Sequence, residues 1–293
     1  MNSKIIELSE LINESLFEYF GDKYPEPLIF DAMDYSVRNG GKRVRPLLTL
    51  LFCDACGGDF KKAVPLALAV EFIHTYSLIH DDLPCMDDDD FRRGKPSNHK
   101  VFGEATAVLA GDGLLTAAFE LISGYQAKGL YSSEVAIKSI LTLSQRAGAR
   151  GMIGGQVLDM QNDNSNNADF DRLKLTDNLK TGALIDAACL LGCIAAEASE
   201  RELEAASEFA YKIGLAFQIK DDILDVTGSF EKLGKIIGSD EINNKVTYVT
   251  LLGLDECREL VNKLTDEAIK ALDAFENNDA LVDFAKYLAD REN

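Results

Sequence analysis

Apolar residues recur every three or four positions along most of this chain, which is the period of an α-helix. In residues 2–20 the apolar positions are Ile5, Leu8, Ile12, Leu16 and Phe20, and this spacing predicts an amphipathic helix. Glycine pairs and prolines interrupt the pattern and set the ends of further helices. The predicted helices cover about 28–38, 44–56, 62–82, 104–123, 133–148, 151–161, 171–196, 200–226, 246–252, 255–276 and 279–290.

The polar–apolar pattern contains no sign of a sheet. We find no apolar–polar alternation longer than four positions, no strand–helix–strand pattern, no fixed-period repeat and no linker rich in Pro, Gly or Ser. Segment 62–82 is apolar on nearly every side, so we expect it at the centre of the molecule. The sequence therefore predicts an all-α protein with a single domain over residues 1–293.

Two acidic clusters each close an apolar helical segment. The first holds six carboxylates within ten positions, namely Asp81, Asp82, Asp87, Asp88, Asp89 and Asp90. The second holds Asp221, Asp222 and Asp225, which lie within an arc of about 100° on one helix face, with Gln218 pointing the same way. Unpaired carboxylates repel one another and resist desolvation. Both clusters therefore predict one cleft that holds hard divalent cations, above all Mg²⁺, with Mn²⁺ as a substitute.

The overall charge excludes several classes of partner. The 293 residues carry a formal net charge of −19, which argues against nucleic acid and against docking on an anionic membrane. No run of about 18 apolar residues is present, so we expect no membrane insertion. The N-terminus does not resemble a signal peptide, and six cysteines in such a chain are typical of reduced thiols, so we expect a cytoplasmic protein. Cys53 and Cys56 form a C-x-x-C that we interpret as buried thiols.

Basic residues lie beside the acidic clusters and the glycine turns. Lys42 and Arg45 open the third helix after Gly40-Gly41, and backbone N–H groups at a helix start add to an anion site. Arg92 and Arg93 follow the first cluster, Lys180 lies in an otherwise apolar helix, and Lys220, Lys235 and Lys245 lie near the second cluster. His74 precedes Asp81 by two helical turns and faces the same cleft. In so acidic a chain, this arrangement indicates binding of a diphosphate bridged by metal ions.

An ordered set of motifs resembles the trans-isoprenyl diphosphate synthases and, within that family, most of all the bacterial farnesyl diphosphate synthases. The matching segments cover nearly the whole chain and occur in the family's order: Gly40 to Pro46, Glu71 to His74, Ser77 to Asp87, Arg92 to Gly94, Ala110 to Asp112, Gly154 to Gln156, Lys180 to Leu184, Phe217 to Asp225 and Gly238 to Asp240. One aspartate pair alone is weak support, whereas this ordered set is highly specific. The resemblance implies an all-helical bundle around a deep central cavity.

The resemblance also assigns roles to single residues. It implies that Mg²⁺ is held by Asp81, Asp82, Asp87, Asp221, Asp222 and Asp225. The allylic diphosphate is expected to contact Arg92, Lys180, Lys220 and Lys235, while isopentenyl diphosphate is expected on Lys42, Arg45, His74 and Arg93. Lys245 is also expected to bind substrate. Thr181, Gln218 and the Lys180 backbone are expected to turn oxygen dipoles toward an allylic carbocation. Catalysis is thus expected to rest on Lys180, Thr181, Gln218, Asp81 and Asp221.

The length of the product and the oligomeric state follow from the same resemblance. Short-chain family members carry a bulky aromatic residue about one turn before the first cluster, or two extra residues within that cluster. This chain has both, with Tyr76 and the spacing from Asp82 to Asp87, and Ser77 lies on nearly the same helix face as Asp81. We therefore expect farnesyl diphosphate as the product, with geranylgeranyl or geranyl diphosphate as alternatives. The apolar segment 104–123 leads us to expect a homodimer.

Other classes of protein fit the sequence less well. A di-iron carboxylate bundle needs Glu-x-x-His on two helices, and only Glu71 to His74 supplies it. A Ca²⁺-binding helical protein needs an EF-hand loop, which is absent, and would leave the basic residues unexplained. A terpene cyclase on the same fold would need neither the second aspartate cluster nor the site for isopentenyl diphosphate.

Overall fold

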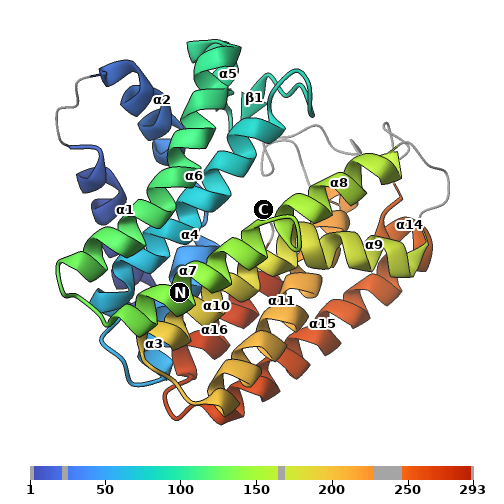
Figure 1. Ribbon diagram of the computed structural model, residues 1–293. Helices are drawn as coiled ribbons and strands as arrows, with labels where there is room; N and C mark the ends of the chain where they lie inside the picture. The colour runs from blue at the N-terminus through green and yellow to red at the C-terminus, as the bar shows by residue number, and fades with distance from the viewer. Residues whose placement is uncertain (1–2, 22–25, 164–168, 228–245, 292–293) are drawn as a thin grey trace.

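The structure is a computed structural model that describes residues 3–21, 26–163, 169–227 and 246–291. The described residues are almost entirely helical, as Figure 1 shows. The helices are α1 Ser3–Tyr19, α2 Pro27–Arg38, α3 Val44–Ala55, α4 Phe60–Asp81, α5 Asn98–Phe102, α6 Glu104–Ala127, α7 Ser133–Ala147, α8 Met152–Asp163, α9 Phe170–Asp177, α10 Ala183–Ala195, α11 Glu200–Thr227, α14 Tyr248–Leu252, α15 Leu254–Ala271 and α16 Asp279–Asp290. A π-helix, η1, covers Asn178–Gly182, and a short 3₁₀ helix, η2, covers Leu272–Ala274.

The predicted all-α class is confirmed, and the predicted helix bounds lie close to the observed ones. Four short elements were not predicted. Two antiparallel strands, β1 Phe91–Arg92 and β2 Lys95–Pro96, pair Phe91 with Pro96 and Arg92 with Lys95. Helix α5 follows them, and the segment predicted as one helix over 171–196 is divided by η1. Each of these elements is at most five residues long, which is too short for a hydrophobic period to reveal.

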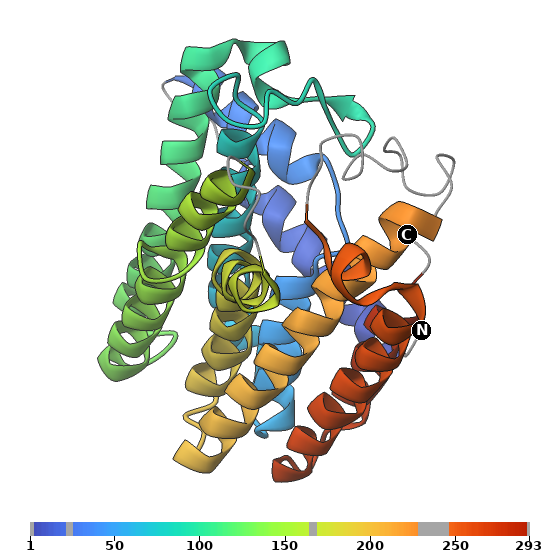
Figure 2. The same cartoon turned by 90° about the vertical axis from the view of Figure 1, so that its right-hand side faces the viewer.

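Helix α4 runs through the core, as its apolar composition predicts. Its buried side chains lie on all sides of the helix, from Ala63 to Ile79, because α3, α6 and α10 pack around it. In Figure 1, α4 lies beside α6, and α11 lies beside α15. Helix α4 ends at Asp81, one residue before a turn that contains Pro84. This end of α4 carries the β1–β2 hairpin, which lies at the top of the molecule in Figure 2.

The expectation that no segment is apolar enough to cross a membrane is wrong by length and composition. Three helical segments in the described chain meet those criteria, namely Phe60–Asp81, Glu104–Ala127 and Phe170–Ala195. A search for uninterrupted apolar runs misses them because single polar residues interrupt the runs, while the apolar majority keeps the mean hydropathy of each window at 1.3 to 1.5. For Phe60–Asp81, 72% of the apolar window is buried inside the protein, so the apolar character of this helix serves the core.

The cysteines lie where helices pack. Cys53, Cys189 and Cys193 are buried, and Cys56 is half-buried. Burial raises the pKa of the Cys53 thiol to about 12, so this thiol stays protonated at neutral pH. Cys56 Sγ lies 3.7 Å from Cys193 Sγ, and neither forms a disulfide. The C-x-x-C is therefore made of packed thiols, as expected.

Candidate active site

A cavity of about 520 Å³ opens between α4, α6, α8 and η1. This volume lies in the range of sites for small organic ligands, about 300–1,000 Å³. Seven of the residues predicted from sequence line it together: Arg45, His74, Tyr76, Ser77, Asp81, Lys180 and Thr181. The rest of the wall is mostly apolar and includes Met86, Leu115, Met152, Ile153, Val157 and Met160. Charged groups thus gather at one part of a cavity that is otherwise suited to a hydrocarbon.

The first acidic cluster folds back on the end of α4. The backbone N–H of Asp87 donates to the carbonyl of Asp81 across 2.8 Å, and the N–H of Asp88 donates to the carbonyl of Leu83 across 3.1 Å. Pro84 lies in this turn and cannot continue the helix. The turn returns Asp87 to the neighbourhood of Asp81, as the spacing of the aspartates predicts.

Asp81 is the carboxylate whose surroundings are most unusual. Burial raises the pKa of Asp81 to about 6, and the nearby carboxylates of Asp87 and Asp82 add to the rise, while Lys180 and Arg92 oppose it. A carboxylate held in this way is stabilised by a cation brought close to it. The donor set around it consists of hard carboxylate oxygens, which fits Mg²⁺.

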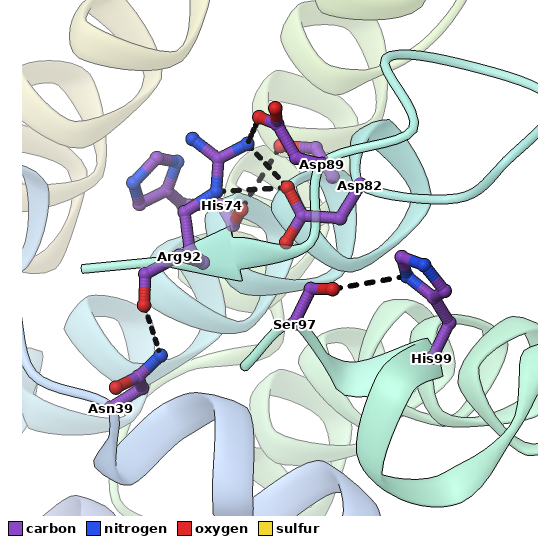
Figure 3. A network of polar contacts seen from close by, with 8 residues as sticks. Asn39, His74, Asp82, Asp89, Arg92, Ser97 and His99 are labelled. Atoms are coloured by element: carbon purple, nitrogen blue, oxygen red, sulfur yellow. Dashed lines mark hydrogen bonds and ion pairs between the residues drawn. The ribbon is translucent and has the colours of Figure 1, made fainter. Parts of the chain in front are cut away.

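Arg92, on strand β1, forms hydrogen bonds with two carboxylates of the first acidic cluster. Its Nε donates to Asp82 Oδ1 at 2.9 Å, its Nη2 contacts the same oxygen, and Nη2 also donates to Asp89 Oδ2 at 3.0 Å. The carbonyl of Arg92 accepts a hydrogen bond of 2.9 Å from Asn39 Nδ2. Figure 3 shows these contacts, with the imidazole of His74 beside the guanidinium. Burial raises the pKa of Asp82 although Arg92 opposes the rise, so part of the negative charge is already balanced.

Four basic groups from distant parts of the chain gather around His74. Burial and the charges of Arg45, Arg93, Arg43 and Arg92 hold the pKa of His74 well below its usual range, so the imidazole is neutral. Burial also lowers the pKa of Arg45 to about 10, and Arg93 contributes to that shift. Arg45 Nε is buried and has no hydrogen-bond partner in the described part of the chain. Clustered, partly desolvated cations of this kind are stabilised by an anion.

The glycine pair before α3 makes room for Arg93. Gly41 has φ of +126°, and a Cβ there would lie 2.6 Å from Arg93 Cζ. The guanidinium of Arg93 donates to the carbonyl of Gly40. Only glycine fits both the backbone conformation and this close approach. The two glycines thus position an arginine that is 52 residues away in sequence from Gly41.

Arg43 has a different role from its neighbours Lys42 and Arg45. Its guanidinium points into the core, where it donates to Glu71 Oε1 at 2.7 Å, to the Val37 carbonyl at 2.7 Å and to Asn13 Oδ1 at 3.1 Å. Arg43 and Glu71 side chains are each 3% exposed. Glu71 is therefore engaged in a buried ion pair, which leaves the di-iron alternative without its carboxylate ligand. The sequence pattern did not reveal this pair.

The π-helix carries Lys180 and Thr181 to the cavity. Lys180 Nζ pairs with Asp159 Oδ2 of α8 at 2.5 Å, a partner that the sequence did not indicate. Gly155 lets the two elements touch, since a Cβ there would lie 2.1 Å from the Lys180 nitrogen. Glycine is therefore required at position 155 of the motif Gly154 to Gln156, because a larger residue would collide with η1. Gln156 itself lines the cavity. Short π-helical segments of this kind are frequent at functional sites.

The second acidic cluster lies on α11 and does not line this cavity. Its helix buries Ile219, Ile223 and Leu224, while Gln218, Asp221, Asp222 and Asp225 lie on the face outside the core. Asp221 Oδ1 accepts a hydrogen bond of 2.7 Å from Arg291 Nη2, and Asp222 Oδ2 accepts one of 2.7 Å from the Tyr248 backbone. The predicted helix that carries these carboxylates is confirmed, since all of them lie in the last two turns of α11.

Arg291 was not singled out from the sequence, although it ends the described chain. Besides its contact with Asp221, it donates to the Phe217 carbonyl at 2.9 Å and stacks on the Phe217 ring at 3.7 Å. Lys42 lies close enough to this pair to feel both charges. Burial and the charge of Arg291 lower the pKa of Lys42, and the charge of Asp221 raises it. Lys220 lies on α11 beside Asp221, and Lys235 and Lys245 lie outside the described residues.

Comparisons with known proteins agree with this geometry. A model of the polyprenyl synthetase family matches residues 26–287. The chain is 46% identical to a farnesyl diphosphate synthase of Bacillus subtilis over 89% of this chain and 88% of the relative. It is 48% identical to geranylgeranyl pyrophosphate synthase 11 (chloroplastic) of Arabidopsis thaliana over 92% of this chain and 76% of the relative.

A solved structure supports the same assignment. The FPP/GFPP synthase of Zymomonas mobilis, in its apo form, superposes with a TM-score of 0.87 at 34% identity, covering 99% of this chain and 100% of that one. The matched region includes both acidic clusters, the basic residues around His74 and the cavity. This chain is therefore a prenyltransferase and belongs to the polyprenyl synthetase family.

Proposed function

We propose that this prenyltransferase is a farnesyl diphosphate synthase, which condenses isopentenyl diphosphate with dimethylallyl diphosphate and then with geranyl diphosphate. The observation that carries the proposal is the position of Tyr76, a buried aromatic residue in the wall of the apolar cavity and about one turn from Asp81. Its ring packs edge-on against His80, with 5.7 Å between centroids. The relative from Bacillus subtilis has the same activity.

In the proposed mechanism, two groups of carboxylates hold the metal ions. One group is Asp81, Asp82 and Asp87, at the end of α4 and in the turn that follows it, and the other is Asp221, Asp222 and Asp225, near the end of α11. Mg²⁺, when bound, neutralises the charge that develops on a diphosphate leaving group. Lys180 and Arg92 lie beside Asp81, as their effects on its pKa indicate, and supply fixed positive charge for the same anion. Together these groups favour cleavage of the allylic C–O bond, which yields a carbocation and diphosphate.

The cluster of Lys42, Arg45, His74 and Arg93 is proposed to bind isopentenyl diphosphate. The unpaired Nε of Arg45 and the lowered pKa of its guanidinium support an anion there. A neutral His74 donates a hydrogen bond without adding charge. Because Arg45, His74 and Asp81 line the same cavity, both diphosphates are held near one another, and coupling becomes effectively intramolecular.

The chain's own groups then guide the carbocation. Lys180 and Thr181 line the cavity. The Lys180 backbone, Thr181 and, from α11, Gln218 are proposed to turn oxygen dipoles toward the cation. The π-electrons of the isopentenyl double bond form the new C–C bond to the cation, and the proton released from the adduct passes to the departing diphosphate. The apolar wall excludes water, which would otherwise capture the cation as an alcohol.

Tyr76 is proposed to limit the growing tail. Packed interiors resist displacement by an added group, so a ring held against His80 stops the tail after three isoprene units. Ser77 lines the same wall, where its hydroxyl donates to the His74 carbonyl at 3.0 Å, and it adds little bulk.

Product analysis with isopentenyl and dimethylallyl diphosphates tests the proposal. Wild type should release the C15 diphosphate, and Tyr76→Ala should release C20 or longer products. Tyr76→Phe is the matched control, because it keeps the ring and removes a hydroxyl that has no hydrogen-bond partner among the described residues; its product should remain C15. A C20 diphosphate as the main wild-type product would overturn the assignment in favour of a geranylgeranyl diphosphate synthase.

A further inference from the structure

A second group of potential metal ligands lies outside both clusters assigned above. One carboxylate oxygen each from Asp88 and Asp90 and a ring nitrogen of His99 lie within 4.8 Å of one another. Asp88 and Asp90 are exposed and lie in the turn before β1, whereas His99 lies in the first turn of α5. None of these residues takes part in the proposed reaction.

His99 is what distinguishes this group from an ordinary acidic surface. The residue is only 6% exposed, and its Nε2 is buried without a hydrogen-bond partner among the residues that the structure describes. Leaving a buried polar nitrogen unpaired costs about 1–3 kcal/mol. An imidazole that lies next to two carboxylates and keeps a buried, unpaired Nε2 therefore favours a cation at this place.

The other ring nitrogen of His99 is already engaged. Nδ1 lies 3.2 Å from Ser97 Oγ, a contact visible in Figure 3. With the proton on Nδ1 and donated to Ser97, Nε2 presents its lone pair, which is how metal-binding histidines are commonly oriented. The backbone also supports this geometry, because the Ser97 N–H donates to the Asp90 carbonyl across 2.9 Å.

The donor set selects the class of metal. Imidazole nitrogen with carboxylate oxygen suits Zn²⁺ and neighbouring transition metals better than Mg²⁺, which prefers oxygen alone. Zn²⁺ binds His nitrogen at about 2.0–2.1 Å and carboxylate oxygen at about 2.0–2.2 Å. Ligand atoms at such distances from one tetrahedral ion lie about 3.4 Å apart, so atoms that now lie within 4.8 Å of one another must draw closer when the ion binds.

Asp90 is at present paired with Lys100, and this pair does not oppose metal binding strongly. Lys100 Nζ lies 2.6 Å from Asp90 Oδ1, and both groups are exposed. Exposed ion pairs of this kind contribute about 0–1 kcal/mol. A dication can therefore displace the ammonium or share the carboxylate with it.

From these observations we propose that Asp88, Asp90 and His99 form a binding site for a transition-metal dication of the Zn²⁺ class, separate from the carboxylate clusters that serve the reaction. A metal there joins the turn before β1 to α5. Between Asp88 and Asp90 lies Asp89, which accepts a hydrogen bond from Arg92. The bound metal would thus fix the segment that carries Arg92.

The test uses the full-length protein labelled with ¹⁵N-histidine and titrated with ZnCl₂ alone. The chain has three histidines, so the imidazole nitrogens can be followed one by one, and His99→Gln assigns the signals of His99. The aspartate clusters contain carboxylates only, so zinc binding to them adds no imidazole ligand. We expect the Nε2 signal of His99 to move and saturate, while Nδ1 stays hydrogen-bonded to Ser97.

Two neighbouring variants make the test specific. Asp88→Asn should weaken zinc binding at His99 at least tenfold, because it removes a charged ligand. Asp89→Asn makes the same change in charge one residue away, at a side chain directed to Arg92, and should leave binding at His99 within about twofold of wild type. The proposal fails if the His99 signals do not move up to millimolar zinc, or if both variants bind equally. Either result leaves the assignment of the product untouched.

Discussion

Neighbouring arginines in one short motif differ in how completely their donors are satisfied. Arg43 gives hydrogen bonds to Glu71, Val37 and Asn13 and is enclosed by the core. Arg45, two residues on, lines the cavity and keeps a buried Nε without a partner in the described chain. A guanidinium whose N–H groups all donate hydrogen bonds within the protein supports the fold. A guanidinium with a buried N–H that has no acceptor is suited to bind an anion.

The buried pair of Arg43 and Glu71 predicts a large effect on stability. Glu71→Gln removes the negative charge and leaves the Arg43 guanidinium buried and uncompensated, which should cost about 3–5 kcal/mol in the free energy of unfolding. Urea denaturation followed by circular dichroism measures it. Glu134→Gln is the control, since Glu134 pairs with Lys138 on the exposed face of α7 and should cost less than about 1 kcal/mol. Equal losses in both variants would contradict the prediction.

Asp81 predicts how metal affinity depends on pH. Its pKa in the metal-free protein is raised to about 6, and the metal binds the ionised carboxylate, so protons and metal compete. The affinity for Mg²⁺ should be nearly constant above pH 7 and should fall about tenfold between pH 7 and pH 5. Calorimetric titration with MgCl₂ across this range measures the effect. Unchanged affinity at pH 5 would show that Asp81 is no ligand.

At the scale of elements, the site depends on where helices touch. Helix α8 meets η1 at Gly155, and the contact sets Lys180 and Thr181 on the cavity wall. The hairpin β1–β2 brings Arg92 over the end of α4, where it binds Asp82. Neither contact follows from the order of the elements. The first depends on how closely α8 approaches η1, and the second on how the turn after α4 folds back over the helix end.

Gly155 gives a prediction at this scale. A Cβ at Gly155 would lie 2.1 Å from the backbone nitrogen of Lys180, so Gly155→Ala must push η1 away from α8. A shift of about 1 Å in positioning groups can cost about 100-fold in rate, and we expect a fall in kcat of that order. Steady-state kinetics measure it. Gly124→Ala on α6 is the control, because its Cβ would meet no atom within 4 Å, and a drop of similar size there would refute the explanation.

Features that depend on residues close in sequence could be predicted, whereas contacts between distant residues could not. Periodicity predicted the long helices, and the spacing of Asp81, Asp82 and Asp87 predicted that the turn folds back, because both depend on residues close in sequence. Asp159 and Arg291 were missed, since each reaches its partner, Lys180 or Asp221, across 21 or 70 positions. The π-turn at Asn178–Gly182 was missed because one extra residue within a turn hardly alters an apolar pattern over 26 residues.

At the scale of the whole molecule, the chain combines a net charge of −19 with substrates that are expected to be anionic. An acidic protein can bind such substrates because basic residues are concentrated at the site. Arg45, Arg92, Arg93 and Lys180 gather near the end of α4, and the carboxylates beside them are suited to divalent cations. The cavity then extends from this charged region along apolar side chains, so one molecule offers a polar site for the diphosphates and a dry one for the tail.

The exterior of α6 predicts that two copies of this chain associate. Val108 and Leu109 lie on its outer face, and Leu109 is 59% exposed, which is unfavourable in an isolated chain. We expect a homodimer of about twice 32.1 kDa, measured by sedimentation equilibrium at micromolar concentration. Leu109→Asp should shift the protein toward the monomer, because a charge would have to be buried between the copies. Ile6→Asp, at an exposed apolar position on α1, should leave the dimer intact. A wild-type protein that sediments only as a 32.1 kDa species would refute the prediction.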